Sequence, residues 1–307
     1  MTALASVGCY LPELGVDVRA IGKAAGADDK TVWKFGKLFG LDTVRRAPEH
    51  DMRGIMAGAV RALPGLRGNE SRVRYVIGAR TMSTAVRADR YPMEEVCQEF
   101  GMTNAVAFTL GQHGCATGLL GVYLAGQLLA ADADPDGLAL VLTGEKTHPV
   151  IQMIPESAVM GESTAACLVS ASGEHDRLLG YATRTCGQWT SVPPDPLDAD
   201  FLKEHNELLA DVMREATDAA GVGLDDVAII LPHNVNRLTW SWTCRVLDLP
   251  LERVYLDNIP VTGHCFAADP FINLVHARDA GRLRRGDTYL MAAVGLGATF
   301  SAAVLRH

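Results

Sequence analysis

The sequence predicts an α/β protein made of two similar halves. Short apolar runs bounded by Gly or polar residues are typical of buried strands, an apolar helix candidate lies between two of them, and the same plan returns in the second part of the chain. With 307 residues, 48% of them hydrophobic, the chain can bury a substantial core in one large unit or two fused ones. We therefore expect one half at residues 1–172 and the other at 173–307.

Three strands and one helix are predicted in the first half. The strands are VRYVIGAR (73–80), GLALVLTGE (137–145) and TAACLVSAS (164–172), each a short apolar run. Between the first two, residues 117–131 place large apolar side chains at helical spacing, and Ala, Gly and Leu fill most other positions. Such a helix has hardly any polar face, so we expect it in the interior.

The second half is predicted to repeat this plan. Its expected elements are a charged helix at about 201–220, a strand VAIILPH (227–233), a helix after Asn236, a strand near ERVYLD (252–257), a helix at about 270–281, and closing strands TYLMAAVG (288–295) and TFSAAVLRH (299–307). The proline-rich segment 186–200 is expected to be a connection, since proline interrupts both helices and strands. We place the boundary between the halves just before it, near residue 173.

Charge and hydropathy exclude several classes of protein. The net charge of -8, from 36 acidic and 28 basic residues, is spread along the chain without a basic block, which argues against nucleic acid as a partner. No apolar run approaches the roughly 20 residues that span a bilayer, and the first residues, MTALASVGCYLPE, lack the basic region and apolar core of a signal peptide. We expect a cytoplasmic protein that does not associate with membranes.

The seven cysteines are expected to be reduced thiols. Their number is odd, most lie singly within apolar stretches, and a chain of this length folds without disulfides. Most of them are therefore interpreted as small hydrophobic residues of the core.

Cys115, in GQHGCATGLL (111–120), is the exception because of its position. It lies where an extended stretch gives way to the apolar helix, and the amides of a helix N-terminus together with a nearby histidine favour a thiolate. The glycines around it would let backbone or substrate approach the sulfur. The alternative is that a Gly/Ala/Cys run only allows tight helix packing.

Three further motifs carry polar groups suited to catalysis. ILPHNVN places His233 at the end of a buried strand, where α/β proteins bind their ligands. VTGHCFAADP places His264 ahead of the helix expected near Pro270. VGLGATF (294–300) is a Gly-containing turn whose backbone N–H groups can point at an anionic oxygen.

Taken together and in this order, these motifs resemble the thiolase superfamily, and within it ketoacyl-ACP synthase III and its relatives. The resemblance extends from GLDTVRRA (40–47), a counterpart of the family's T-G-I-x-x-R-R stretch, to the terminal strand. It implies a thiolase fold, five-layered α-β-α-β-α and built from two pseudo-repeated halves, which usually pairs as a homodimer.

The resemblance also implies roles for individual residues. Cys115 matches the nucleophile, and His233 in PHNVN matches the catalytic histidine of P-H-Q-A-N. GLGATF matches the closing G-G-G-F turn, so the backbone amides of Cys115 and Leu296 would form the oxyanion hole. Trp33, in KTVWKFG, is a candidate for contact with coenzyme A, and Asn236 for substrate binding. No permanently bound cofactor is implied; acyl-CoA or the phosphopantetheine thioester of an acyl carrier protein would be the donor.

The chain departs from the family at the third catalytic residue. The condensing enzymes carry an asparagine in G-N-T-S-A-A-S, whereas this chain reads GHCFAAD, with His264 in its place. An imidazole still donates a hydrogen bond, but it also accepts a proton. The sequence therefore favours an acyltransferase that moves an acyl group from Cys115 to a hydroxyl or amine, with His233 or His264 as base, and relatives of this kind occur in natural-product pathways.

Other interpretations remain open. A ketosynthase that decarboxylates a malonyl thioester is the first alternative, and a non-catalytic scaffold of the same fold is the second. A metal site built from His113, Cys115, His264 and Cys265 is not expected, because the spacing lacks the paired C-x-x-C form of structural zinc sites. Asp269 is interpreted as a helix N-cap rather than as a partner of His264. By analogy with the family, segment 81–95 is expected near the acyl pocket or the partner subunit.

Overall fold

The computed structural model describes residues 2–82, 92–132, 134–148, 151–189 and 197–307. Its central feature is a nine-stranded sheet in the order β11-β12-β13-β10-β1-β9-β6-β4-β5. The strands are β1 (Ala3–Tyr10), β4 (Val73–Ala79), β5 (Val106–Leu110), β6 (Leu138–Gly144), β9 (Thr164–Ser170), β10 (Arg177–Thr185), β11 (Val227–Pro232), β12 (Thr288–Gly295) and β13 (Thr299–Arg306).

The two parts of this sheet follow a similar plan, parallel strands and then antiparallel ones, with five strands in one part and four in the other. In one part, β5, β4 and β6 are parallel, and β9 and β1 follow in antiparallel pairing. In the other, β11 and β12 are parallel, and β13 and β10 follow in antiparallel pairing. The two parts join where β1 pairs with β10 at Ala3 and Arg177. The division at 172/173 falls between β9 and β10 and remains a prediction.

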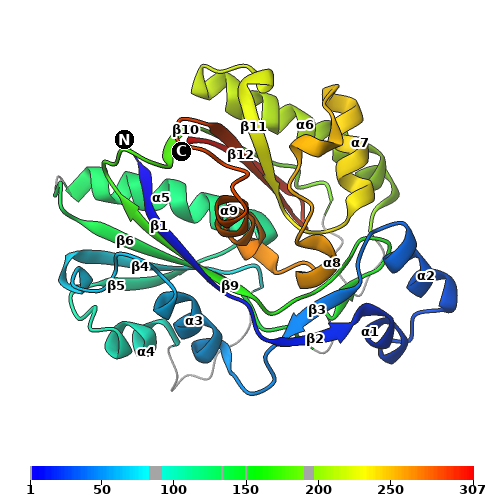
Figure 1. Ribbon diagram of the computed structural model, residues 1–307, viewed down its shortest axis with the longest axis horizontal. Coiled ribbons are helices and arrows are strands. Elements are labelled where there is room, and N and C mark those ends of the chain that lie inside the picture. The colour runs from blue at the N-terminus through cyan, green and yellow to red at the C-terminus, as the bar shows by residue number, and fades with distance from the viewer. Residues whose placement is uncertain (1, 83–91, 133, 149–150, 190–196) are drawn as a thin grey trace.

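The helices lie in three layers around the two parts of the sheet. Helices α5 (Thr117–Asp132) and α9 (Asp269–Asp279) lie between them, in one core with residues from both parts (Figure 1). α3 (Met52–Arg61) and α4 (Pro92–Glu99) pack on the outer face of the first part, and α6 (Ala199–Ala220) and α7 (Arg237–Leu247) on that of the second. The expected five-layered α-β-α-β-α fold is confirmed.

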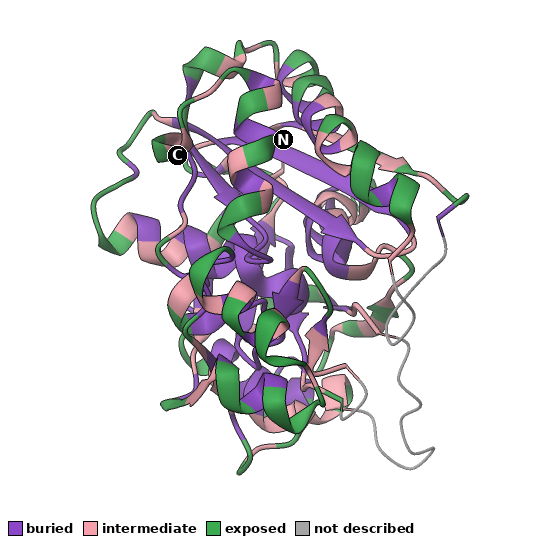
Figure 2. Ribbon diagram, turned by 90° about the vertical axis from the view of Figure 1, so that its right-hand side faces the viewer, coloured by how far each residue is buried: buried purple, intermediate pink, exposed green. Residues whose placement is uncertain are grey.

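Each central strand contributes side chains to two layers because its side chains alternate. In β12, Tyr289 and Met291 join the core around α5 and α9, whereas Leu290 and Ala292 join the core beneath α6 and α7. Strands that are buried on both faces read as continuous apolar runs, which is why the sequence shows them clearly. Figure 2 shows this burial in the strands, with exposed residues on the outer helices.

Helix α5 is apolar all round because one part of the nine-stranded sheet packs on each side of it. The segment Gly114–Asp132 is long and apolar enough to cross a membrane by length and composition, and more than half of it is buried inside the fold. Gly118 lies where the chain ahead of α9 passes, and a Cβ there would be 2.7 Å from the carbonyl oxygen of Ala267. The predicted interior helix is confirmed.

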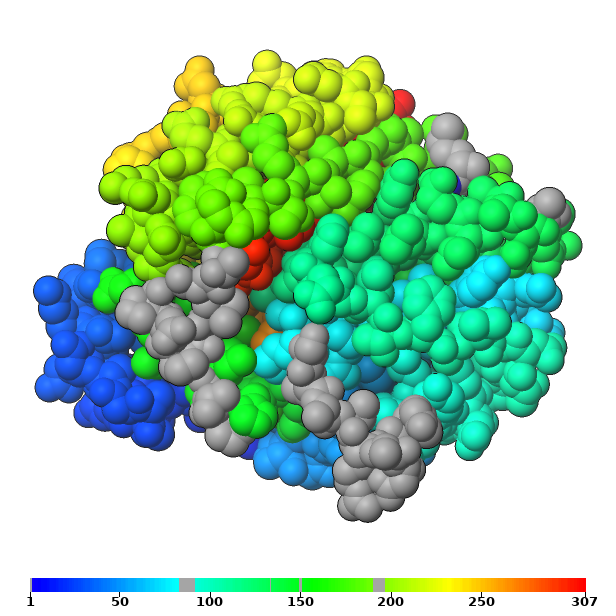
Figure 3. Space-filling model, turned by 180° about the vertical axis from the view of Figure 1, so that it is seen from behind, coloured from blue at the N-terminus to red at the C-terminus, as the bar shows by residue number. Residues whose placement is uncertain are grey.

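The smaller elements flank these layers. They are β2 (Leu14–Asp17), which pairs with β3 (Thr43–Arg46), β7 (Met153–Ile154), which pairs with β8 (Ala158–Val159), and the helices α1 (Val18–Ala24), α2 (Asp29–Lys37) and α8 (Ile259–Thr262). Viewed from behind, the C-terminal part of the chain is visible at the floor of a hollow between the two parts of the molecule (Figure 3).

One predicted strand is wrong. The strand expected at 252–257 is a single 3-10 turn, Leu251–Arg253, followed by one parallel bridge between Val254 and Ile230. Pro250 starts that turn and cannot donate to a ladder, so pairing is limited to the N–H of Tyr255, which donates to the carbonyl of Ile230 at 2.9 Å. The other predicted strands and helices are confirmed.

Two expected segments lie partly outside the described residues. Residues 83–91 belong to the segment expected near the acyl pocket, and residues 190–196 to the connection expected at 186–200.

Candidate active site

Cys115 lies in a tight turn at the start of the central helix. The 3-10 turn Gly114–Ala116 leads directly into α5, and the Thr117 hydroxyl donates to the carbonyl of Gly114 at 2.7 Å, which holds the turn. The side chain of Cys115 is buried, with 5% of its surface exposed. Its Sγ lies 3.1 Å from Nε2 of His264.

His264 is held by backbone contacts with the other half of the chain. Its N–H donates to the carbonyl of Val159 at 2.9 Å, and its carbonyl accepts from the N–H of Gly161 at 2.8 Å. Gly263 before it has φ 66°, and a Cβ there would be 2.7 Å from the oxygen of Val159. Only glycine fits this position, so the approach of His264 to Cys115 is set by main-chain packing.

Asp269 holds the other nitrogen of His264. Its Oδ2 lies 2.5 Å from Nδ1 of His264, and the same carboxylate accepts from the N–H groups of Asn234 at 2.6 Å and Cys265 at 2.7 Å. The N-cap interpretation of Asp269 is wrong: α9 begins at Asp269 itself, and the carboxylate turns towards the preceding loop instead of the helix amides. Cys115, His264 and Asp269 therefore form a buried chain of three hydrogen-bonded side chains.

The three hydrogen-bonded side chains influence one another's protonation. Burial by itself lowers the pKa of His264, but the adjacent sulfur of Cys115 and the carboxylate of Asp269 outweigh it and raise the pKa to about 10. The imidazole is then positively charged at neutral pH, between the sulfur of Cys115 and the carboxylate of Asp269. Such an arrangement favours the thiolate form, which is the nucleophile.

His233 lies in the same site without bonding to Cys115. It follows β11, its N–H donates to Ala292, and its carbonyl accepts from the indole N–H of Trp240 at 3.0 Å. Its ring centre is 6.0 Å from that of His264, and its buried Nδ1 has no hydrogen-bond partner among the residues that the structure describes. Burial, with the two neighbouring histidines His264 and His205, lowers the pKa of His233 well below 6.5, so its ring is neutral.

The turn between β12 and β13 packs against the nucleophile turn. A Cβ on Gly295 would lie 1.9 Å from the carbonyl oxygen of His113, and a Cβ on Gly114 would lie 3.1 Å from the amide nitrogen of Leu296. The two glycines therefore bring the amide of Leu296 beside the turn that carries Cys115. This placement is compatible with an oxyanion hole made by the two amides, whose role stays a prediction.

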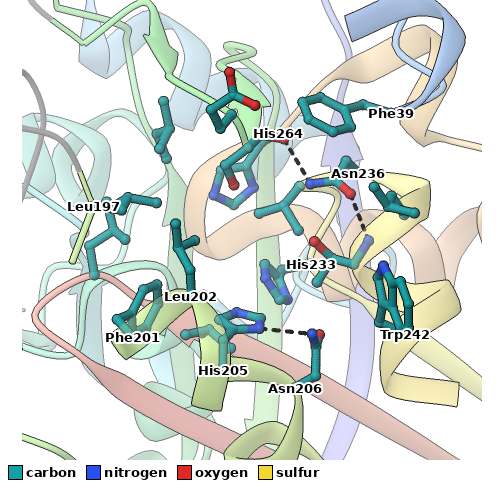
Figure 4. A pocket seen from close by; sticks show the side chains of 18 of the residues that line it. Phe39, Leu197, Phe201, Leu202, His205, Asn206, His233, Asn236, Trp242 and His264 are labelled. Atoms are coloured by element: carbon teal, nitrogen blue, oxygen red, sulfur yellow. Dashed lines mark hydrogen bonds between the residues drawn. The ribbon is translucent and has the colours of Figure 1, made fainter. Parts of the chain in front are cut away.

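A cavity of about 130 Å³ reaches Cys115 from the surface (Figure 4). The described residues that line it come from both halves: Phe39, Cys115, Ile154, Glu156, Ser157, Leu197, Phe201, Leu202, His205, Asn206, His233, Val235, Asn236, Leu238, Thr239, Trp242, His264, Val294 and Leu296.

The two predicted binding residues have different positions. Asn236 lines the cavity, but its side chain also caps α7 by accepting from the N–H of Thr239 and donates to the carbonyl of Ser157. Trp33 lies on α2, is 55% exposed, and is absent from the described lining. The tryptophan in the lining is Trp242 of α7, over whose ring the guanidinium of Arg245 lies at 4.6 Å.

Sequence reasoning missed most of the cavity lining, including polar and aromatic side chains from two helices. His205 and Asn206 come from α6, and Trp242 comes from α7. The only signal in the sequence is that His205 follows Phe201 by one helical turn, and both line the cavity.

As for metals, within the described part of the chain no group of three or more His, Cys, Asp or Glu side chains is arranged to hold an ion.

Comparison with known sequences finds one family and several curated relatives. Residues 217–307 match the family described as 3-oxoacyl-[acyl-carrier-protein (ACP)] synthase III C terminal. A beta-ketoacyl-[acyl-carrier-protein] synthase III of Roseiflexus sp. (strain RS-1) is 32% identical over 151 residues, covering 46% of this chain and 45% of the relative. A protein with the same name from Rhizorhabdus wittichii is 29% identical over 223 residues, covering 71% of this chain and 67% of the relative. The first match thus spans less than half of the relative's length.

Solved structures match over the whole chain. A structure named ChlB3, an acyltransferase, has a TM-score of 0.85 and 20% identity, covering 99% of this chain and 97% of the other. The 3-oxoacyl-[acyl-carrier-protein] synthase III of Aquifex aeolicus VF5 has a TM-score of 0.81 and 20% identity, covering 100% of both chains. At this identity the likeness concerns the fold.

Proposed function

Because this chain is a ketoacyl-ACP synthase III-like protein of the thiolase superfamily, we propose that it is an acyltransferase working through a thioester on Cys115. The acyl group would come from coenzyme A or an acyl carrier protein and pass to a hydroxyl or amine of an acceptor. The observation that carries this proposal is the hydrogen-bonded chain Cys115–His264–Asp269.

In the first half-reaction, the thiolate of Cys115 attacks the carbonyl carbon of the donor thioester. The tetrahedral oxyanion would be held by the amides of Cys115 and Leu296. When the intermediate collapses, the donor's carbon–sulfur bond breaks, and the leaving thiolate takes the proton from Nε2 of His264. Cys115 is then acylated, and His264 is neutral.

The second half-reaction restores the starting state. Neutral His264, oriented by Asp269 through Nδ1, accepts the proton of the acceptor as its oxygen or nitrogen attacks the acyl carbon. The bond to Cys115 breaks, and its sulfur leaves as a thiolate beside the newly formed imidazolium. This is the charged arrangement that the raised pKa of His264 describes.

A second function is favoured by the names of the relatives. Beta-ketoacyl synthases condense acyl groups, and a neutral His233 with His264 would supply two donors to the enolate of a malonyl thioester. In the acyl-enzyme, however, His264 is neutral and Asp269 holds its one proton at Nδ1, so Nε2 is a base and not a donor, and general-base chemistry is what transfer to a hydroxyl or amine requires. We therefore place acyl transfer first.

The test is intact-mass analysis of the purified protein after incubation with a panel of acyl-CoA thioesters that includes malonyl-CoA. The transferase predicts an adduct that is absent in Cys115→Ala, retains its carboxylate when malonyl is the donor, and discharges onto alcohols or amines. Discharge only onto malonyl thioesters, with loss of carbon dioxide, would establish the condensing reaction instead. His264→Asn, which restores the residue of the condensing enzymes, should favour that second outcome.

We propose a homodimer, a cytoplasmic location, a role in natural-product biosynthesis, and Trp33 and Asn236 as contacts of the donor. The curated relatives are named for an acyl carrier protein, which supports carrier-bound thioesters as donors.

A further inference from the structure

Two consecutive side chains of α6 contribute polar groups to the cavity without belonging to the catalytic chain. The ring of His205 is held between Phe201 and Phe300, with ring centres 5.3 Å and 5.7 Å away and near-perpendicular or steeply inclined planes. Asn206 accepts from the hydroxyl of Thr243 at 3.1 Å. Both side chains are therefore fixed, and the 3.4 Å contact between them is too long to use fully the hydrogen-bonding capacity of either.

These side chains lie on the path towards the reacting sulfur. The three rings of His205, His233 and His264 face the same cavity, and His233 lies between the other two (Figure 4). His205 is partly exposed, whereas His233 and Cys115 are buried, so His205 lies nearer to solvent than the other two. The buried Nδ1 of His233 has no hydrogen-bond partner among the described residues.

The lining offers hydrogen bonds but almost no charge. Burial lowers the pKa of His205 to about 4 and that of His233 well below 6.5, so both are neutral at physiological pH. Glu156, at 51% side-chain exposure, is paired with Lys34 at 2.5 Å. Among the described lining residues there is no Lys or Arg, and the one lining group whose pKa is raised towards a positive charge is His264, beside Cys115.

We propose that His205 and Asn206, together with His233, form an acceptor subsite that selects an uncharged hydroxyl compound. This inference rests on the proposed function and narrows its acceptor from a hydroxyl or amine to an alcohol. The selection follows from desolvation: an ammonium group would find no free carboxylate in this cavity and a carboxylate would find no cation, whereas a hydroxyl can donate to or accept from a neutral imidazole or amide. The apolar residues Phe39 and Trp242 would contact the carbon skeleton.

The chemical step balances with the groups present. The acceptor O–H gives its proton to Nε2 of His264, its oxygen forms the ester bond to the acyl carbon, and the bond from that carbon to Sγ of Cys115 breaks. His205 takes no part in proton transfer; it is an acceptor-positioning residue.

The first experiment measures binding without turnover, as protection of Cys115 against iodoacetamide, followed by peptide mass mapping. Benzyl alcohol, benzylamine and benzoate share a ring and differ in charge at neutral pH. The subsite predicts half-protection by benzyl alcohol at a concentration about tenfold lower than by either charged probe. Equal protection by all three probes, or no protection by benzyl alcohol, overturns the inference and leaves acyl transfer itself untouched.

The second experiment uses variants of His205 on the acyl-enzyme. We expect His205→Phe, which keeps the ring packing, to raise the KM for the alcohol about tenfold and to lower kcat for transfer much less. His205→Gln retains a donor and an acceptor and should recover most of that loss. The control is His175→Phe, an exposed histidine away from the cavity.

The outcomes separate the two proposals. Failure of every donor to acylate Cys115 contradicts the proposed function, and the subsite falls with it. The subsite alone is overturned if the acyl-enzyme discharges onto benzylamine as readily as onto benzyl alcohol. It is also overturned if the KM for the alcohol is the same in His205→Phe as in the wild-type protein.

Discussion

The contact between His264 and Asp269 determines what the imidazole does beside Cys115. A carboxylate at Nδ1 fixes the proton there, leaves Nε2 facing the sulfur, and stabilises the imidazolium during transfer. Because two backbone amides also donate to Asp269, its orientation does not depend on the histidine alone. The base is thus aligned before any substrate arrives.

Removing this carboxylate should impair transfer far more than folding. In Asp269→Asn the amide can present its nitrogen to Nδ1 and stabilise the wrong tautomer, so we expect kcat for transfer to fall by a factor on the order of 10²–10⁴. Single-turnover discharge of the acyl-enzyme measures this rate of transfer. Asp218→Asn, an exposed residue of α6, is the matched control. A loss below about threefold would show that Asp269 only supports the backbone.

The raised pKa of His264 predicts a flat pH dependence of thiol reactivity. With that pKa at about 10 instead of 6.5, the imidazolium persists as pH rises through neutrality and is lost only near pH 10. Alkylation of Cys115 should therefore vary little between about pH 6.5 and 9. In His264→Asn the rate should rise steeply over the same interval, as for an isolated thiol. Parallel profiles in the two proteins would contradict the ion pair.

At the level of elements, the approach of two turns depends on small residues. The β12–β13 turn lies so close to the turn of Cys115 that a side chain on Gly295 would collide with the carbonyl of His113. Because the contact joins main-chain atoms of both turns, no flexible side chain can move aside. The position of the Leu296 amide is consequently as fixed as that of the sulfur.

Gly295→Ala should separate these turns. We expect acylation of Cys115 to slow by a factor on the order of 10²–10³, the loss typical of removing one oxyanion donor. The acylation rate with a saturating acyl-CoA measures this. Gly187→Ala is the control, because a Cβ there meets nothing within 4 Å. If both variants acylate at the wild-type rate, the amide of Leu296 does not contribute to the oxyanion hole.

The sequence predicted those elements and site residues whose signal is local. Strands buried on both faces, such as β6, and the all-apolar helix α5 read directly as apolar runs. The strand expected at 252–257 failed because a 3-10 turn follows Pro250, and Val254 after that turn forms only one bridge, to Ile230. Asp269 was misassigned because Asp before Pro at a helix start is so often a cap, whereas here the loop at 263–265 folds back onto it. His205 and Asn206 could not be found, since only tertiary packing turns that face of α6 to the cavity.

In the whole molecule, the middle layer of α5 and α9 is shared by both parts of the sheet. Phe271 of α9 is fully buried, and a Cβ on Gly118 of α5 would lie 2.9 Å from its ring. One core therefore contains side chains from residues 4 to 305. We infer that the two parts unfold together.

The variant Phe271→Ala tests whether the two parts unfold together. Loss of a buried phenylalanine should lower the free energy of unfolding by about 3–5 kcal/mol and shift a single transition that appears at the same urea concentration by circular dichroism and by tryptophan fluorescence. Leu14→Ala, at a position 48% exposed, should change stability by less than about 0.5 kcal/mol. Two separated transitions in the wild-type protein would show that each half unfolds by itself.

The contact between Cys115 and His264 joins residues 149 positions apart, and the backbone of His264 is held by Val159 and Gly161. The thiol is therefore activated only after distant segments of the chain have met. During refolding from denaturant, rapid alkylation of Cys115 would appear later than helix formation, when the two parts of the sheet pack on the middle layer. The reactivity of the catalytic cysteine thus reports the last step of assembly, and quenched alkylation followed by mass spectrometry measures when that step occurs.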